Sequence, residues 1–252
     1  MNAAELQANT PYARFGTFAI DAPVDARRTF IRKTYMHLAM AIYAFVALEW
    51  FLFSVGFDDW MMQFFAGGGA MPMLIMLGAF IATSWIANYW AHSDTSVGLQ
   101  YAGLFLYVLA EAIIFVPLLM IAQGYALEFG AIGNVSVITV AAITTLIMFG
   151  GLTAAVFLTR QDFSFLRTAL WIGGAAAFAL ILVGAFAGLQ LGVWFSVAMI
   201  VLACGWILYD TSNVLHHYRT EQHVAASLAL FASVALLFWY VLRLLMALSS
   251  RD

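Results

Sequence analysis

One carboxylate stands inside a long apolar part of the sequence, at Asp210 in GWILYDTSNVLHHY (residues 205–218). An ionisable side chain at membrane depth is costly, so it usually faces the protein interior or a water-filled cavity and tends to be functional. If the segment is helical, one face carries a polar stripe of Trp206, Asp210, Asn213 and His217. The alternative is that Asp210 only caps a helix end. We take Asp210 and Asn213 as candidates for an ion pathway or a proton-sensing site, because burial favours the neutral form of a carboxyl group.

Three further charged residues fall in apolar segments. Glu49 and Arg243 lie at matched depth near the same side of the membrane, and a buried arginine needs a carboxylate or carbonyl partner. We therefore expect a buried Glu49–Arg243 ion pair, the alternative being that Arg243 reaches the membrane surface alone. Glu111 lies near the centre of its segment. It is either a second acid of the pathway or a protonated carboxyl group bonded to a neighbouring helix.

The histidines do not have the spacing of a metal site. His216 and His217 are adjacent, so on a helix they diverge by about 100°. The sequence contains no HExxH motif, no glycine-rich phosphate loop and no nucleophile elbow. We predict no enzyme, no catalytic residue and no bound metal or cofactor. A membrane hydrolase built on His37, Asp210 and Ser233 is the alternative from another class.

The composition is that of an integral membrane protein. Of 252 residues, 65% are hydrophobic and 9% are charged, and the mean hydropathy is +0.95. A soluble domain has about 25% charged residues. The net charge of −3 does not favour a nucleic-acid partner. The partner that the composition predicts is the lipid bilayer.

Seven apolar segments are long enough to cross a bilayer, and in lipid they must be helices. They are about 30–54, 71–91, 97–122 and 134–158, two within 168–215 with a hinge near 188–192, and 225–248. The predicted fold is therefore an all-α polytopic membrane protein with seven transmembrane helices. We divide the chain into a polar cytoplasmic tail at 1–29, a transmembrane domain at 30–248 and a short outer tail at 249–252.

The basic residues predict the orientation of the chain. One side of the membrane would hold eight of them: Arg14, Arg27, Arg28, Arg32, Lys33, Arg160, Arg167 and Arg219. The other side would hold only Arg251. Cytoplasmic segments carry the excess of basic residues, so we expect a cytoplasmic N-terminus.

Depth along the spans groups some of the polar residues. At a rise of 1.5 Å per residue, Asp210, Ser233 and His37 share one level near the cytoplasmic side. This level makes His37 a possible additional pathway group beside Glu111.

Four segments carry a family resemblance: RKTYMHLAMAIYAFVAL (32–48), TTLIMFGGLTAAVFLTRQDFSFL (144–166), GWILYDTSNVLHHY (205–218) and AASLALFASVALLFWYVLRLL (225–245). Together they resemble the Bax inhibitor 1 family, in its bacterial branch. The resemblance implies seven helices with the last one central, in the inner (plasma) membrane of a bacterium. It also implies a pH-sensitive calcium leak, with only transient Ca²⁺ binding. Members are linked to suppression of cell death in eukaryotes and to modulation of a membrane-bound protease in bacteria.

The chain departs from the family at its pH sensor, a pair of aspartates on the last two spans. Asp210 matches the first, and counting back from Arg243 places Ser233 at the second. We expect Ser233 to face Asp210 and donate a hydrogen bond to it. Two close carboxylates share a proton, whereas a lone aspartate lacks that coupling and binds Ca²⁺ less well. The predicted function is a leak of cations, calcium or protons, with Asp210 on the pathway. The alternative is a non-conducting regulator of a membrane-bound protease or another partner.

Overall fold

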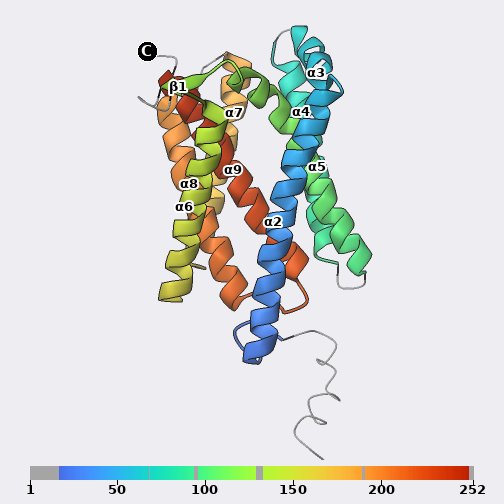
Figure 1. Cartoon of the computed structure of the whole chain (residues 1–252), viewed down its shortest axis with the longest axis vertical. Coiled ribbons are helices and arrows are strands. Elements are labelled where there is room, and N and C mark those ends of the chain that lie inside the picture. The colour runs from blue at the N-terminus through green and yellow to red at the C-terminus, as the bar shows by residue number, and fades with distance from the viewer. Residues whose placement is uncertain (1–16, 68, 94–95, 129–132, 189–190, 250–252) are drawn as a thin grey trace, which may run out of the picture.

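The computed structural model describes residues 17–67, 69–93, 96–128, 133–188 and 191–249. Within these residues, seven helices are long and apolar enough to cross a membrane (Figure 1). They are α2 (Val24–Ser54), α4 (Met71–Ala91), α5 (Val97–Ala122), α6 (Val137–Thr159), α7 (Leu166–Ala187), α8 (Val193–His216) and α9 (His223–Ser249). The predicted all-α membrane fold is confirmed. The largest difference in a boundary is at α2, which begins six residues before the predicted first span.

Local sequence signals fix several helix ends. The Ser96 side chain accepts a hydrogen bond from the backbone N–H of Leu99 and caps α5, and Ser136 caps α6 in the same way. Such caps satisfy backbone donors that have no partner inside the helix. At the other end of α7, Gly188 adopts a left-handed conformation with φ of 67°. This is the hinge that the sequence predicted between the fifth and sixth spans.

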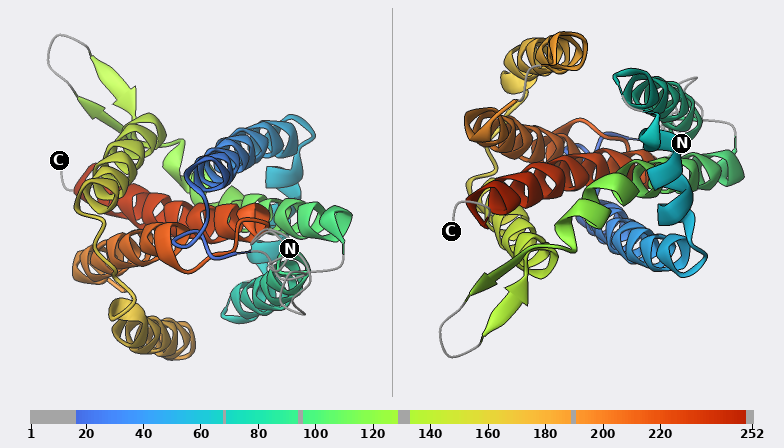
Figure 2. Two further views of the ribbon diagram at one scale, coloured as in Figure 1. Left: turned by 90° about the horizontal axis from the view of Figure 1, so that it is seen from below. Right: turned by 90° about the horizontal axis from the view of Figure 1, so that it is seen from above.

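Helix α9 is the centre of the bundle. It contacts α2, α4, α5, α6 and α8, and these helices surround it in both end views (Figure 2). In its apolar window 72% of the residues are buried, compared with 50% in α5 and 28% or less in the other spans. This confirms the expectation that the last helix is central.

Helix α9 crosses the bundle obliquely and changes neighbours along its length (Figure 1). Its first half packs against α2, where Val224 and Phe231 share a core cluster with Leu38. Its second half packs against other helices, and Leu242 shares a cluster with Ile207 of α8. The second half of α2 packs mainly against α5 and α3. The core shared by α2 and the first half of α9 thus lies at one end of the bundle.

The connection between α2 and α4, which lies outside the predicted spans, contains a further helix. Helix α3 (Phe57–Ala66) follows Gly56, which has a positive φ of 73°. The Trp60 ring stacks between those of Phe57 and Phe64, and Met61 is buried against the bundle. After α5, strands β1 (Ala126–Glu128) and β2 (Asn134–Ser136) form a short antiparallel hairpin.

Residues 17–23, here called the N-terminal strap, lie against the turn between α8 and α9. The N–H of Ala19 donates to the carbonyl of Tyr218 at 2.8 Å, and the N–H of Thr220 donates to the carbonyl of Thr17 at 3.1 Å. Ala19 is fully buried. This part of the predicted tail is therefore packed on the end of the bundle, while residues 1–16 and the predicted outer tail from 250 on lie outside the described residues.

Candidate functional site

The contact between Asp210 and Ser233 joins the sixth span to the central helix. The Ser233 hydroxyl donates to the Asp210 carboxylate over 2.5 Å, and both side chains are buried. The predicted hydrogen bond is confirmed, and with it the register counted back from Arg243. A carboxylate held by one hydroxyl group can take up a proton, and the strength of this hydrogen bond changes when it does.

A second acid lies close to this contact through a tyrosine of α5. The carboxylate of Asp210 is close enough to the hydroxyl of Tyr107 to act on it electrostatically, and Tyr107 also interacts with Glu111 one helical turn further on. Glu111 is buried, and this partner is on its own helix rather than on a neighbouring one. Both acids thus act electrostatically on Tyr107, a relation that the sequence alone did not indicate.

Three buried hydroxyl groups form a cluster that the sequence did not indicate, and one of them belongs to Thr211, the residue after Asp210. Tyr35 of α2, Thr153 of α6 and Thr211 of α8 lie close together, and all three hydroxyl oxygens are buried. None has a partner with hydrogen-bond geometry among the described residues. Serine, threonine and tyrosine hydroxyls inside a membrane bundle commonly bind each other or water. No sequence motif could have found the cluster, because its members come from three distant segments.

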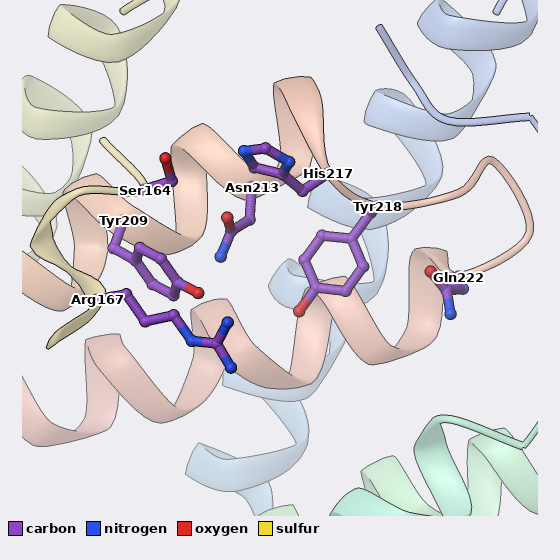
Figure 3. Close-up of a pocket in the computed structure, with 7 residues that line it drawn as sticks. All are labelled: Ser164, Arg167, Tyr209, Asn213, His217, Tyr218 and Gln222. Atoms are coloured by element: carbon purple, nitrogen blue, oxygen red, sulfur yellow. The ribbon is translucent and has the colours of Figure 1, made fainter. Parts of the chain in front are cut away.

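The predicted polar stripe on α8 divides into two parts. Asp210 points toward α9, whereas Asn213 and His217 line a pocket of about 400 Å³ (Figure 3). Trp206 packs against Trp171 of α7. We call this opening, between the start of α7, α8 and the α8–α9 turn, the α7–α8 pocket. Asp210 is only 7% exposed and is not among the residues that line it.

Asp162, an acid outside the spans, binds two of the residues that line this pocket, Ser164 and His217. Asp162, in the loop between α6 and α7, accepts hydrogen bonds from the backbone N–H of Ser164 at 2.8 Å and from Ser212 at 3.3 Å. The His217 Nε2 lies 3.1 Å from the same carboxylate. Desolvation opposes ionisation, but the hydrogen bonds from Ser164 and His217 outweigh it and lower the pKa of Asp162. No motif in the sequence indicated Asp162 as a candidate site residue.

The predicted ion pair between Glu49 and Arg243 is wrong. Both carboxylate oxygens of Glu49 are buried with no hydrogen-bond partner among the described residues. Arg243 instead donates to the carbonyl of Leu191 at 3.4 Å and lies over the ring of Tyr240. The oblique course of α9 takes its second half away from α2 (Figure 1). Matched depth therefore did not mean contact.

His37 lies in a separate cluster at the end of the bundle. Its Nδ1 is 2.6 Å from the carbonyl of Lys33, its Nε2 is 2.9 Å from the hydroxyl of Tyr101, and its ring is 4.9 Å from that of His223. Among the described residues, none of these contacts joins the cluster to Asp210. Across the described ranges there is no group of three or more His, Cys, Asp or Glu side chains that could hold a metal ion.

The fold and the site define a seven-span membrane protein with a buried aspartate on the sixth span that bonds to the central seventh. Comparison with known protein families shows which family of membrane proteins the chain belongs to. The family model described as inhibitor of apoptosis-promoting Bax1 matches residues 27–251, so the chain belongs to the Bax inhibitor family.

Individual relatives agree with this assignment. The chain is 25% identical over 246 residues to protein lifeguard 4 of Mus musculus, which covers 94% of this chain and 92% of the mouse protein. It is 32% identical over 120 residues to Bax inhibitor 1 of Schizosaccharomyces pombe, covering 46% of this chain and 44% of the yeast protein. An uncharacterized protein of Pseudomonas aeruginosa is 34% identical over 112 residues, covering 43% and 49%. The last two matches span less than half of the relatives' length.

Proposed function

We propose that the protein is a proton-controlled cation leak, with Asp210 on the pathway and Ca²⁺ among the cations that pass. It acts in the inner membrane with its N-terminus in the cytoplasm. Transport is its activity, and no catalysis is assigned to its residues. Ser233, Asn213, Glu111 and His37 are additional candidates along the route.

The observation that carries this proposal is the buried Asp210–Ser233 hydrogen bond. It ties α8 to the central helix, and both side chains are buried. A charged carboxylate accepts a hydrogen bond roughly twice as strong as a neutral one does. The contact should therefore be tight at high pH and looser at low pH. With no second acid on α9, one proton rather than a coupled pair controls it.

A second candidate function is that of a non-conducting regulator, which binds a membrane-bound protease or another membrane partner. The observation in its favour is that Asp210 is 7% exposed, is bonded to Ser233 and does not line the α7–α8 pocket. A carboxylate locked in this way stabilises a helix pair without ever meeting an ion.

The test is cation flux into proteoliposomes as a function of pH. Wild type, Asp210→Asn and Ser233→Asp are compared, with Asp162→Asn as a matched control outside the spans. We expect the cation flux of the wild type to rise as the pH falls. In Asp210→Asn the flux should no longer change with protonation of residue 210. In Ser233→Asp the flux should depend on the binding of two protons. Identical profiles in all four proteins would reject proton sensing at Asp210. Flux no greater than in protein-free vesicles would reject the leak and favour the regulator.

A further inference from the structure

The α7–α8 pocket presents hydrogen-bond donors to a common space. The guanidinium group of Arg167, the hydroxyl groups of Tyr209 and Tyr218 and the side-chain amide of Asn213 point toward one another across the opening (Figure 3). They come from the first turn of α7, from α8 and from the α8–α9 turn. Burial raises the pKa of Tyr218 well above its usual range, so its phenol stays neutral and can donate.

The carboxylates near the pocket are already engaged. Asp162 accepts from Ser164, Ser212 and His217, and Asp210 accepts from Ser233. The structure gives the Arg167 side chain no hydrogen bond or ion pair with any described residue. A guanidinium group without a counter-ion, facing three further donors, attracts an anion.

A neighbouring glutamine adds to the excess of donors. The Oε1 of Gln222 accepts from the backbone N–H of Arg219 at 3.1 Å. The side-chain oxygen of Gln222 thus already accepts a hydrogen bond, and its side-chain nitrogen can donate to a ligand in the pocket. Oxygen atoms of a phosphate group can accept from all of these donors, because phosphate offers several strong acceptors on one charged centre.

The position of the pocket indicates where such an anion comes from. It lies at the end of the bundle where α2 begins and where most of the described basic residues gather: Arg27, Arg28, Arg32, Lys33, Arg160, Arg167 and Arg219. Next to Arg167 in the fold, the rings of Phe165 and Trp171 are exposed, at 67% and 64%. Exposed aromatic rings are typical of the level of lipid headgroups.

We infer that the α7–α8 pocket binds the phosphate group of an anionic lipid headgroup, with Arg167 as its principal ligand. A volume of about 400 Å³ admits a phosphate with its glycerol. Basic pockets between membrane helices bind phosphate headgroups in this way. The inference is independent of whether the protein conducts ions.

The test is native mass spectrometry of the detergent-solubilised full chain with dioleoyl phosphatidic acid or dioleoyl phosphatidylcholine. Arg167→Gln is compared with the control Arg160→Gln, which removes the same charge from the same loop region outside the pocket lining. Both side chains are exposed, so both variants should keep the wild-type melting temperature. We expect one tightly bound phosphatidic acid on the wild type, about tenfold weaker binding in Arg167→Gln and no change in Arg160→Gln.

Inorganic phosphate alone, titrated against lipid-free wild type, distinguishes the two sources of the anion. Binding much weaker than that of phosphatidic acid supports a lipid site, whereas an equal or higher affinity assigns the pocket to free phosphate and overturns the lipid. Equal affinity of the wild type for the two lipids overturns the inference. An equal loss of phosphatidic acid in the two arginine variants does so as well, and the phosphate titration gives a result even if Arg167→Gln does not fold.

Discussion

Ser233 and Asp210 are joined by a single short hydrogen bond, and both side chains are buried. Ser233→Ala would leave the buried Asp210 carboxyl group without its donor. We expect the free energy of unfolding to fall by about 1–3 kcal/mol, the cost of an unsatisfied buried polar group. Thermal unfolding in detergent at neutral pH measures this change.

Ser227→Ala is the matched control for this variant. Ser227 is also a buried serine of α9, but its hydroxyl donates at 2.7 Å to the carbonyl of Val224 on the same helix. Its removal leaves no side chain of another helix unpaired, so a smaller loss is expected. Equal losses in the two variants would contradict the importance of the contact between helices.

Asp162 predicts a pH dependence at the end of the bundle. Its pKa is lower in the folded protein than the ordinary value of 3.8, so its ionised form stabilises the fold above that pH. The contribution is lost as the pH falls through the lowered pKa. The carboxylate is 44% exposed, so solvent screening keeps the gain below about 1 kcal/mol.

The measurement compares melting temperatures of wild type and Asp162→Asn between about pH 6 and about pH 3. We expect the wild type to be the more stable at the upper end and the difference to shrink toward the lower end. Asp58→Asn, at the other end of the bundle, controls for loss of a charge. A difference that stays constant with pH would show that the charge of Asp162 does not stabilise the loop.

For single residues, the sequence correctly predicted the contact between Asp210 and Ser233 but wrongly predicted a contact between Glu49 and Arg243. The difference has a physical reason. Asp210 and Ser233 lie on helices that are consecutive in the chain, so counting residues from the turn between them fixes their relative depth. Glu49 and Arg243 lie on helices whose shared core lies at the other end of the bundle. Their separation depends on the crossing angle of α9, which packing decides and counting cannot reveal.

Helix α3 attaches to the bundle through one side chain more than any other. Met61 is 2% exposed and packs with Leu52, Ala112 and Val116, whereas its neighbour Met62 is 59% exposed. Met61→Ala should therefore cost about 2–5 kcal/mol of stability, as buried methionines do. Met62→Ala should change it by no more than about 0.5 kcal/mol. Urea or thermal unfolding of both variants tests the expectation, which fails if Met62→Ala is the more damaging.

Gly103 permits the close approach of α4 and α5. A methyl group at this position would lie 2.5 Å from the carbonyl oxygen of Ala87 and 2.7 Å from the backbone nitrogen of Ala91. Backbone atoms cannot move aside as a flexible side chain can. Gly103→Ala should therefore destabilise the protein by about 1–3 kcal/mol through overpacking.

Gly78 of α4 is the control for this substitution. Nothing lies within 4 Å of a methyl group built there, and the residue is helical. Gly78→Ala should leave the stability unchanged or raise it by up to about 1 kcal/mol, because alanine has the higher helix propensity. If both alanine variants melted at the wild-type temperature, the close packing of α4 on α5 would not be limiting.

The seven spans could be predicted because each follows from length and composition alone. A run of about 20 apolar residues must become a helix in lipid wherever it packs. Helix α3 has only ten residues and carries Asp58 and Asp59 in its first turn. Its apolar face is buried only because it packs against α5, and the local sequence does not show that α5 is its neighbour.

The two ends of the molecule should lie on opposite sides of the membrane. The chain has a single cysteine, so a Cys204→Ser protein gives a background free of thiols. On it, Asp59→Cys lies one span after the N-terminal strap and Gln161→Cys lies four spans after it. The distribution of arginine and lysine predicts that Gln161 faces the cytoplasm and Asp59 faces outward.

Labelling with a membrane-impermeant maleimide measures this orientation. In intact cells Asp59→Cys should react, and Gln161→Cys should react only after permeabilisation. The opposite pattern would reverse the predicted orientation, and reaction of both in intact cells would contradict an odd number of spans between the two positions.

The central helix also has a consequence for biosynthesis. Helix α9 follows the other six spans in the chain, so the ribosome makes it after them, yet five of those helices pack against it. Until it enters the bilayer, the earlier spans have no common core and Asp210 has no Ser233. A nascent chain that lacks these 27 residues is therefore a loose set of helices with an unpaired acid in lipid. We therefore expect membrane quality control to recognise such an unfinished chain more readily than the finished molecule.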